Sequence, residues 1–261
     1  MRSHKTMNRS GPGKRVYGNA RTDPGFGSSI RCHAGAPQIA GRSIRKLFTA
    51  LGALVLLAAG CTPFGANRLA LFNGRDFSGW TYVLSDTTVS FRDVWSVRDG
   101  VIHCTGVPDG YLRTEASFAD YRLHLEWRWE GEPTNSGVLL HCQDPDRIWP
   151  NAVECQLQAG NAGDFVLIGP SRMTVGDSIH AIARGWRVIP KRHASSENPA
   201  GEWNTMEITV AGDRIVCEVN GILQNEANVV SLVSGPIALQ SEGSPIRFRN
   251  IWIESLEESR E

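Results

Sequence analysis

The stretch Tyr121-Arg-Leu-His-Leu-Glu-Trp-Arg-Trp129 decides the fold class. Tyr, Leu or Trp occupies every second position, and charged or polar side chains fill the positions between them. A period of two places the apolar residues on one face of an extended strand, whereas the apolar face of a helix repeats about every 3.6 residues. The stretch therefore predicts a strand with one buried and one polar face, as in an antiparallel sheet.

The sequence on both sides of this stretch consists of similar short segments separated by turn signals. Asn220-Gly221, Asp99-Gly100 and Gly243-Ser244 each indicate a hairpin turn. Beyond residue 61 no segment has the periodicity and caps of a helix of about ten residues. Residues 160–200, rich in Gly, Pro and polar side chains, are expected to form a long loop region. The pattern predicts a single all-β domain over residues 62–261, an antiparallel sandwich or jelly roll.

The formal charge of the 261 residues is zero, but it is divided unevenly. Residues 1–60 hold ten Lys and Arg and one acid, a net +9, whereas residues 61–261 hold 17 basic residues and 26 acids, a net −9. The acidic part argues against nucleic acid and other polyanions as partners and is compatible with a neutral sugar.

The basic part contains a targeting signal. Arg42, Arg45 and Lys46 precede an uncharged run of 14 residues that ends before Cys61 and is too short to span a membrane permanently. Ala58-Ala-Gly-Cys61 resembles a bacterial lipobox, in which the Cys is lipidated. We expect residues 41–61 to be a lipoprotein-type signal peptide and residues 1–40 a disordered or incorrectly assigned leader. An ordinary signal peptide cut nearby is the alternative. The protein would then be exported to the bacterial periplasm or outer cell surface, touching the membrane only through its lipid anchor.

Four cysteines follow Cys61: Cys104, Cys142, Cys155 and Cys217. Cys142 and Cys155 lie on two predicted arms of one hairpin, and export would permit a disulfide between them. Lone buried thiols are the alternative. The spacing of the four does not match a metal site.

Seven motifs resemble, in order, the 3-keto-disaccharide hydrolase family, formerly a domain of unknown function. They are Leu71-Phe-Asn-Gly-Arg-Asp-Phe-Ser-Gly-Trp80, Leu125-Glu-Trp-Arg128, Asn135-Ser-Gly-Val138, Val153-Glu-Cys-Gln156, Gly201-Glu-Trp-Asn204, Gly235-Pro-Ile-Ala-Leu-Gln240 and Phe248-Arg-Asn-Ile251. The resemblance covers nearly all of residues 62–261. It implies a concanavalin A-like jelly roll, export that often includes a lipid anchor, and cleavage of glycosides whose sugar carries a ketone at carbon 3.

Three predicted strands place polar residues on one face each. Residues 121–129 carry Glu126 and Arg128, and residues 137–143 carry His141, which shares a face with Leu139. Residues 152–158 carry Glu154 and Gln156. If the polar faces line one concave sheet, these side chains converge on one groove. The alternative is a set of solvated residues that form cross-strand ion pairs on an outer face.

The implied chemistry needs a base, an acid and a cation. A ketone at carbon 3 acidifies the hydrogen on carbon 2, so that a base can remove it. The enolate that results expels the carbon-1 substituent and becomes an enone, which water then hydrates. We expect Glu154 to be the base, Arg128 to stabilise the enolate, and Glu126 or His141 to be the acid. A direct glycosidase mechanism with Glu126 and Glu154 is the alternative, decided by the distance between their carboxyls.

Further side chains are expected to bind the saccharide. Asn135, Gln156 and Gln240 would bind sugar hydroxyls, and Trp149 would stack on a ring or close a hairpin. Family members often have Arg at the position of His141.

The family also often has His near the position of Glu242, so these two departures predict an altered specificity or a lost activity. No cofactor is expected, and no metal signature is present. A calcium site formed by loop carboxylates such as Asp144 and Asp146 is left as an alternative. A non-catalytic carbohydrate-binding module and a laminin-G-type interaction protein are the alternative functions.

Overall fold

The computed structural model of the chain describes residues 68–143 and 147–256. The expected leader, the signal peptide with Cys61, and the candidate calcium ligands Asp144 and Asp146 lie outside these residues. No helix among the described residues is long and apolar enough to cross a membrane.

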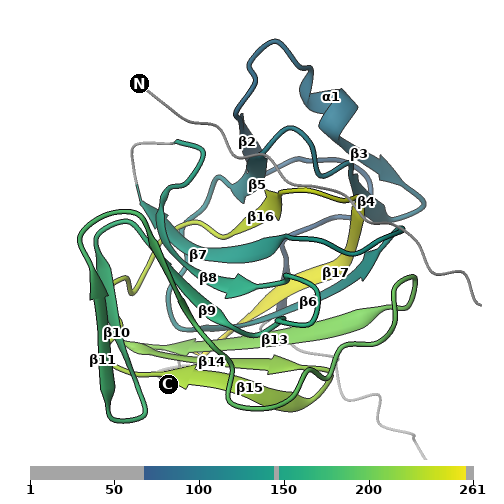
Figure 1. Cartoon of the computed structure of the whole chain (residues 1–261). Coiled ribbons are helices and arrows are strands. Elements are labelled where there is room, and N and C mark those ends of the chain that lie inside the picture. The colour runs from purple at the N-terminus through teal and green to yellow at the C-terminus, as the bar shows by residue number, and fades with distance from the viewer. Residues whose placement is uncertain (1–67, 144–146, 257–261) are drawn as a thin grey trace, which may run out of the picture. The chain divides into compact units, whose positions relative to one another are not determined.

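Two antiparallel sheets contain all but two of the described strands, and the chain passes several times from one sheet to the other (Figure 1). The first, called here the β6 sheet, has the order β15 (Ile222–Ala227), β14 (Arg214–Val219), β13 (Asn204–Ala211), β6 (Tyr121–Trp129), β17 (Ile246–Ser255), β4 (Val101–Cys104) and β3 (Trp95–Arg98), with β1 (Arg68–Ala70) also paired to β17. The second, called here the β8 sheet, has the order β12 (Trp186–Ile189), β9 (Phe165–Ile168), β8 (Asn151–Gln156), β7 (Gly137–Gln143), β16 (Ala238–Ser241), β5 (Gly110–Thr114) and β2 (Trp80–Leu84). The arrangement is a concanavalin A-like jelly-roll sandwich, and the predicted fold class is confirmed.

A hairpin and a short helix complete the described elements. The hairpin of β10 (Ser171–Val175) and β11 (Ser178–Ile182) stands at the left of Figure 1, and α1 (Phe91–Val94) is a single turn before β3. The strands β9 to β12 all lie within residues 160–200, so the expectation of a long loop region there is wrong. The Gly, Pro and polar residues of this region mark turns between short strands.

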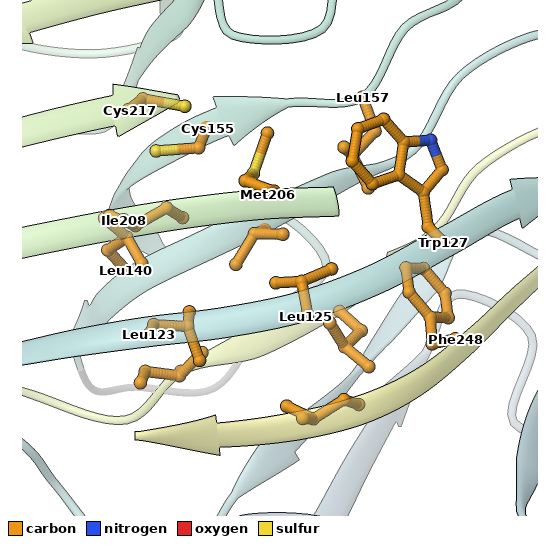
Figure 2. Packing of buried hydrophobic residues seen from close by; sticks show 14 of the residues in the cluster. Leu123, Leu125, Trp127, Leu140, Cys155, Leu157, Met206, Ile208, Cys217 and Phe248 are labelled. Atoms are coloured by element: carbon orange, nitrogen blue, oxygen red, sulfur yellow. The ribbon is translucent and has the colours of Figure 1, made fainter. Parts of the chain in front are cut away.

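The core lies between the two sheets. Leu123, Leu125 and Trp127 of β6 are fully buried and pack with Leu140 and Cys155 of the β8 sheet (Figure 2). Buried and partly exposed residues alternate along the whole of β6, as its sequence predicts. Each fully buried Leu side chain of this core contributes about 1.5–3 kcal/mol by leaving water, which makes the shared interior the main stabilising feature of the fold.

A bulge in β7 changes the expected faces of that strand. Its register with β8 shifts between Leu140 and Gln143, and His141 has a φ of 56°. Within the bulge His141 contacts core residue Tyr121, while Cys142 packs with Leu139 on the opposite face. The expectation that Leu139 and His141 share one face is therefore wrong, because a positive φ interrupts the alternation.

All four described cysteines are buried, and no two of them form a disulfide. Cys142 packs on the face of the β8 sheet that carries Leu139, whereas Cys155 lies in the core between the sheets, beside Cys217. The disulfide between Cys142 and Cys155 is not formed, because the two side chains point to opposite faces of the sheet.

Candidate functional site

A groove of about 680 Å³ lies on the face of the β8 sheet that points away from the core. The side chains that line it are Asn135, Arg147, Trp149, Glu154, Gln156, Gln158, Arg184, Trp186, Gln240 and Glu242, together with the apolar Val166, Ile168 and Val188. Five residues selected from the sequence therefore meet here: Asn135, Trp149, Glu154, Gln156 and Gln240. The polar face of β8 forms the floor because Val153 and Cys155, which alternate with Glu154 and Gln156, are packed in the core.

Glu154 is the most unusual of these groups, since only 3% of its surface is exposed. Its strand neighbours are Leu139 on β7 and Val166 on β9, both apolar. Gly137 leaves room for the carboxyl: a Cβ at that position would lie 2.0 Å from Oε1 of Glu154. That oxygen has no hydrogen-bond partner among the described residues. Burial, together with nearby Glu242, raises the pKa of Glu154 to about 8, so the group holds its proton at neutral pH.

Glu242 is the second carboxyl of the groove. It follows β16, and its backbone forms an isolated bridge with Asn135. Burial and the charge of Asp109 raise its pKa, whereas the side-chain hydrogen bond from Asn135 favours the ionised form and acts in the opposite direction. The charge of Glu242 in turn adds to the raised pKa of Glu154, and the more deeply buried Glu154 binds its proton more tightly.

Three side-chain amides surround the carboxyls. Oε1 of Gln156 accepts the backbone N–H groups of Leu157 at 3.2 Å and Gln158 at 3.3 Å, which leaves its NH₂ group to donate to a ligand. Gln240 is 2% exposed, and its Oε1 has no hydrogen-bond partner among the described residues, nor does Oδ1 of Asn135. Buried polar atoms of this kind are normally paired, so their concentration in one groove indicates a ligand site.

Two indoles form part of the walls. Trp149 is partly buried, whereas Trp186 on the edge strand β12 is 74% exposed. Large exposed aromatic faces in a polar groove are suited to stacking on a ring of the ligand. Trp186 is not among the residues predicted from the sequence, because its segment was expected to be a loop. The alternation of Trp186 and Val188 was the local signal that could have revealed it.

Glu126 and Arg128 do not reach this groove. They lie on the outer face of the β6 sheet, where Glu126 accepts a hydrogen bond from Nε of Arg249 at 2.6 Å and another from Asn250. Arg128 lies over the Trp203 ring, 4.9 Å from its centroid. The expected convergence is wrong for these two residues, because both sheets turn their apolar faces to one core and their polar faces therefore point in opposite directions.

The direct mechanism with Glu126 and Glu154 fails for the same reason, since the core separates the two carboxyls. Glu126 instead fits the alternative of a cross-strand ion pair on an outer face.

His141 is also outside the groove. It is fully buried, its Nδ1 lies 2.7 Å from the carbonyl oxygen of Leu232, and its Nε2 lies 3.2 Å from the Tyr121 hydroxyl. Burial lowers the pKa of His141, which favours a neutral ring that donates from Nδ1 and accepts from Tyr121. This arrangement serves the core, so His141 is not placed to be the predicted acid.

No group of three or more His, Cys, Asp or Glu side chains among residues 68–143 and 147–256 is arranged to hold a metal ion. The groove instead combines amides and carboxyls with two indoles, polar and aromatic groups of the kind that orient a small-molecule ligand.

Comparisons with known proteins agree with this architecture. A candidate glycosyl hydrolase from Parabacteroides distasonis has 22% identity and a TM-score of 0.54, and the match covers 73% of this chain and 94% of that one. A second candidate glycosyl hydrolase from the same organism has 25% identity and a TM-score of 0.52, with 72% and 99% covered. No curated protein sequence matches the chain.

The family model described as the 3-keto-alpha-glucoside-1,2-lyase-like domain matches residues 68–254. This range contains every described residue of the groove and all of both sheets except Ser255, the last residue of β17. The chain belongs to the 3-keto-alpha-glucoside-1,2-lyase-like family.

Proposed function

We propose that the protein cleaves glycosides whose sugar is oxidised to a ketone at carbon 3, with Glu154 and Glu242 as the reacting pair. The observation that carries the proposal is the buried carboxyl of Glu154, whose pKa is raised, beside a second carboxyl in the groove. Two carboxyls whose environments separate their pKa values are suited to act as acid and base at one pH.

The roles follow from the two environments. Glu242 is only half-buried and its carboxylate accepts a hydrogen bond from Asn135, so it is the base in our proposal. Glu154 keeps its proton at neutral pH and is the acid. This reverses the assignment of Glu154 as base that the sequence suggests, because burial favours the protonated form of a carboxyl.

The proposed reaction balances with one proton moved at each carboxyl. Glu242 removes the carbon-2 proton, and the electron pair forms an enolate with the carbon-3 oxygen. As the enolate collapses and restores the ketone, a double bond forms between carbons 1 and 2 while the glycosidic bond between carbon 1 and oxygen breaks. The departing glycosidic oxygen leaves with its substituent and takes the proton of Glu154. Water adds across the double bond, with hydroxyl on carbon 1 and hydrogen on carbon 2, so that the net reaction is hydrolysis.

The amides support the proposed reaction by holding the sugar. The free NH₂ group of Gln156 is suited to donate to an oxygen that gains charge in the enolate, in place of the Arg128 guanidinium. Gln240 and Asn135 have unpaired oxygens suited to accept sugar hydroxyls. Trp149 and Trp186 are suited to stack on the sugar or its substituent.

A matched pair of substrates tests the proposal. Purified protein should release the aglycone from an aryl 3-keto-glucoside and leave the unoxidised glucoside intact. In D₂O the product should carry deuterium at carbon 2, which direct displacement at carbon 1 does not introduce. Glu154→Gln and Glu242→Gln should each reduce release by about a hundredfold or more. Release that is unchanged in both variants would disprove the roles of the pair.

The exposed Trp186 favours a second candidate, a non-catalytic carbohydrate-binding module with the same groove. Such a module would bind saccharide without turnover, and it has no need of an acid with a raised pKa. Tight binding of the 3-keto-glucoside by wild type without any release of aglycone would select it.

We further propose that the chain is exported and lipid-anchored at Cys61, on the strength of the apolar run before that residue. Protein from the membrane fraction should carry the mass of a lipid on an N-terminal Cys61. Cys61→Ser should move the protein to the soluble fraction, and a wild-type protein with no lipid would refute the anchor.

A further inference from the structure

The groove contains two arginines that its carboxyls do not use. Arg147 and Arg184 both line it, and neither forms an ion pair with a carboxylate of the described residues. Four other arginines do form such pairs: Arg122 with Glu207, Arg214 with Glu226, Arg247 with Glu130, and Arg249 with Glu126. The guanidiniums of the groove are thus available to a ligand.

The two arginines come from other segments than the reacting carboxyls. Arg147 lies in the connection between β7 and β8, and Arg184 lies in the turn before the edge strand β12, whereas Glu154 lies in β8 and Glu242 follows β16. With Glu154 protonated, the lining holds two guanidiniums and at most one ionised carboxylate, that of Glu242. The groove lining is therefore net positive, although residues 61–261 together carry a net charge of −9.

Each arginine precedes a groove tryptophan by two residues. The sequences Arg147-Ile-Trp149 and Arg184-Gly-Trp186 come from separate segments, and all four Arg and Trp side chains line the groove. The turn that carries Arg184 is held by a 2.9 Å hydrogen bond from the Gly169 N–H to the Gly185 carbonyl. Each pair offers an aromatic face for a ring and a guanidinium for an anionic group.

We infer that the substituent cleaved from carbon 1 is a ring that carries an anionic oxygen group, a carboxylate or a sulfate, bound by the two Arg-X-Trp pairs. This inference rests on the proposed function, because it takes the sugar to lie at Glu154 and Glu242. The arginines then meet the part of the substrate beyond the bond that breaks. Guanidiniums bind both anions through paired hydrogen bonds, so the chemistry that they share is a planar or tetrahedral oxyanion.

Binding of unoxidised glucosides tests the inference without turnover. We expect wild type to bind 4-carboxyphenyl and 4-sulfophenyl glucoside about tenfold more tightly than 4-carbamoylphenyl glucoside, measured by titration calorimetry at low salt. The ratio of the affinities for the charged and the neutral glucosides should fall towards one in Arg147→Gln/Arg184→Gln, and it should also decrease in about 0.5 M salt. A stronger effect with one anion identifies which oxyanion the site prefers.

Arg187→Gln is the matched control, because Arg187 is an exposed residue of β12 that does not line the groove. It should keep the wild-type preference. Equal binding of the charged and neutral glucosides by wild type, or an unchanged preference in the double variant, overturns the inference. Release of the aglycone from the neutral 3-keto compound reports on the proposed function separately, so the two can fail independently.

Discussion

Glu154 is the residue whose chemistry the fold changes most. Its carboxyl fills the space over Gly137, and its neighbours on the adjacent strands are the apolar Leu139 and Val166, so its charged form loses hydration without gaining a cation. A carboxyl in such a place favours its protonated form. The same burial that makes it an acid at neutral pH also makes the folded state sensitive to pH.

Stability should therefore fall as the pH rises through the range in which folded Glu154 holds a proton that the unfolded chain has lost. That range runs from the ordinary pKa of 4.5 to about 8. Between pH 5 and pH 8 wild type should lose about 3 kcal/mol more unfolding free energy than Glu154→Gln, measured by urea unfolding. Equal losses in the two proteins would show that Glu154 titrates normally.

Gly137→Ala should reduce activity while leaving the fold intact. The new Cβ would lie 2.0 Å from Oε1 of Glu154, and the carboxyl is the end of a flexible side chain that can move away. A displaced acid should lower kcat/KM for the 3-keto-glucoside by about ten- to a hundredfold, with an unchanged circular dichroism spectrum.

The same substitution in a Glu154→Gln background is its control. It should cause little further loss there, because the affected group is already absent. If Gly137→Ala lowered kcat/KM by the same factor in the Glu154→Gln background as in wild type, Gly137 would act through another group than Glu154.

At the scale of single elements, β6 and β8 show the same alternation but serve opposite faces of the molecule. The polar residues of β6 form ion pairs on the outside of one sheet, whereas those of β8 form the floor of the groove. The edge strand β12 adds Trp186 to the wall. An edge strand is suited to this role because its side chains have a neighbouring strand on one side only.

Trp186→Ala should weaken substrate binding with little effect on stability. Its side chain is 74% exposed, so its removal exposes little of the core, while a stacking surface of the groove is lost. We expect KM to rise about fivefold to tenfold and the Tm to change by less than about 2 °C. Ile179→Ala on β11 removes a similarly exposed side chain outside the groove and should leave KM unchanged.

At the scale of the whole molecule, the sandwich keeps two polar surfaces apart. The apolar faces of the β6 and β8 sheets share one core, so the groove and the ion pairs of Glu126 cannot meet. A change on the outer face of the β6 sheet should therefore affect stability alone.

Glu126→Gln tests this separation. It removes the partner of Arg249 and should lower the unfolding free energy by about 1 kcal/mol or less, since the pair is partly exposed. Its kcat/KM for the 3-keto-glucoside should stay within about twofold of wild type. A large loss of turnover in a fully folded variant would contradict the separation, because it would link the reaction to the outer face of the β6 sheet.

Much of this protein follows from local patterns in its sequence. The alternation in residues 121–129, the hairpin turns and the absence of helical periodicity predict an antiparallel sandwich, because side-chain direction repeats every two residues in any strand. The sequence also predicts ligand-binding or catalytic roles for the polar residues of β8, the amides Asn135 and Gln240, and Trp149, all of which line the groove. Ordered motifs also pointed to the family that the chain belongs to.

Tertiary structure alone decided which polar faces share a site. Alternation shows that Glu126 and Glu154 each oppose a buried face, but it carries no information on which sheet holds the strand. The bulge at His141 and the approach of Glu242 to Glu154 depend on contacts between segments far apart in the sequence. A strand pattern is set by neighbours along the chain, whereas a site is set by neighbours across the sheets.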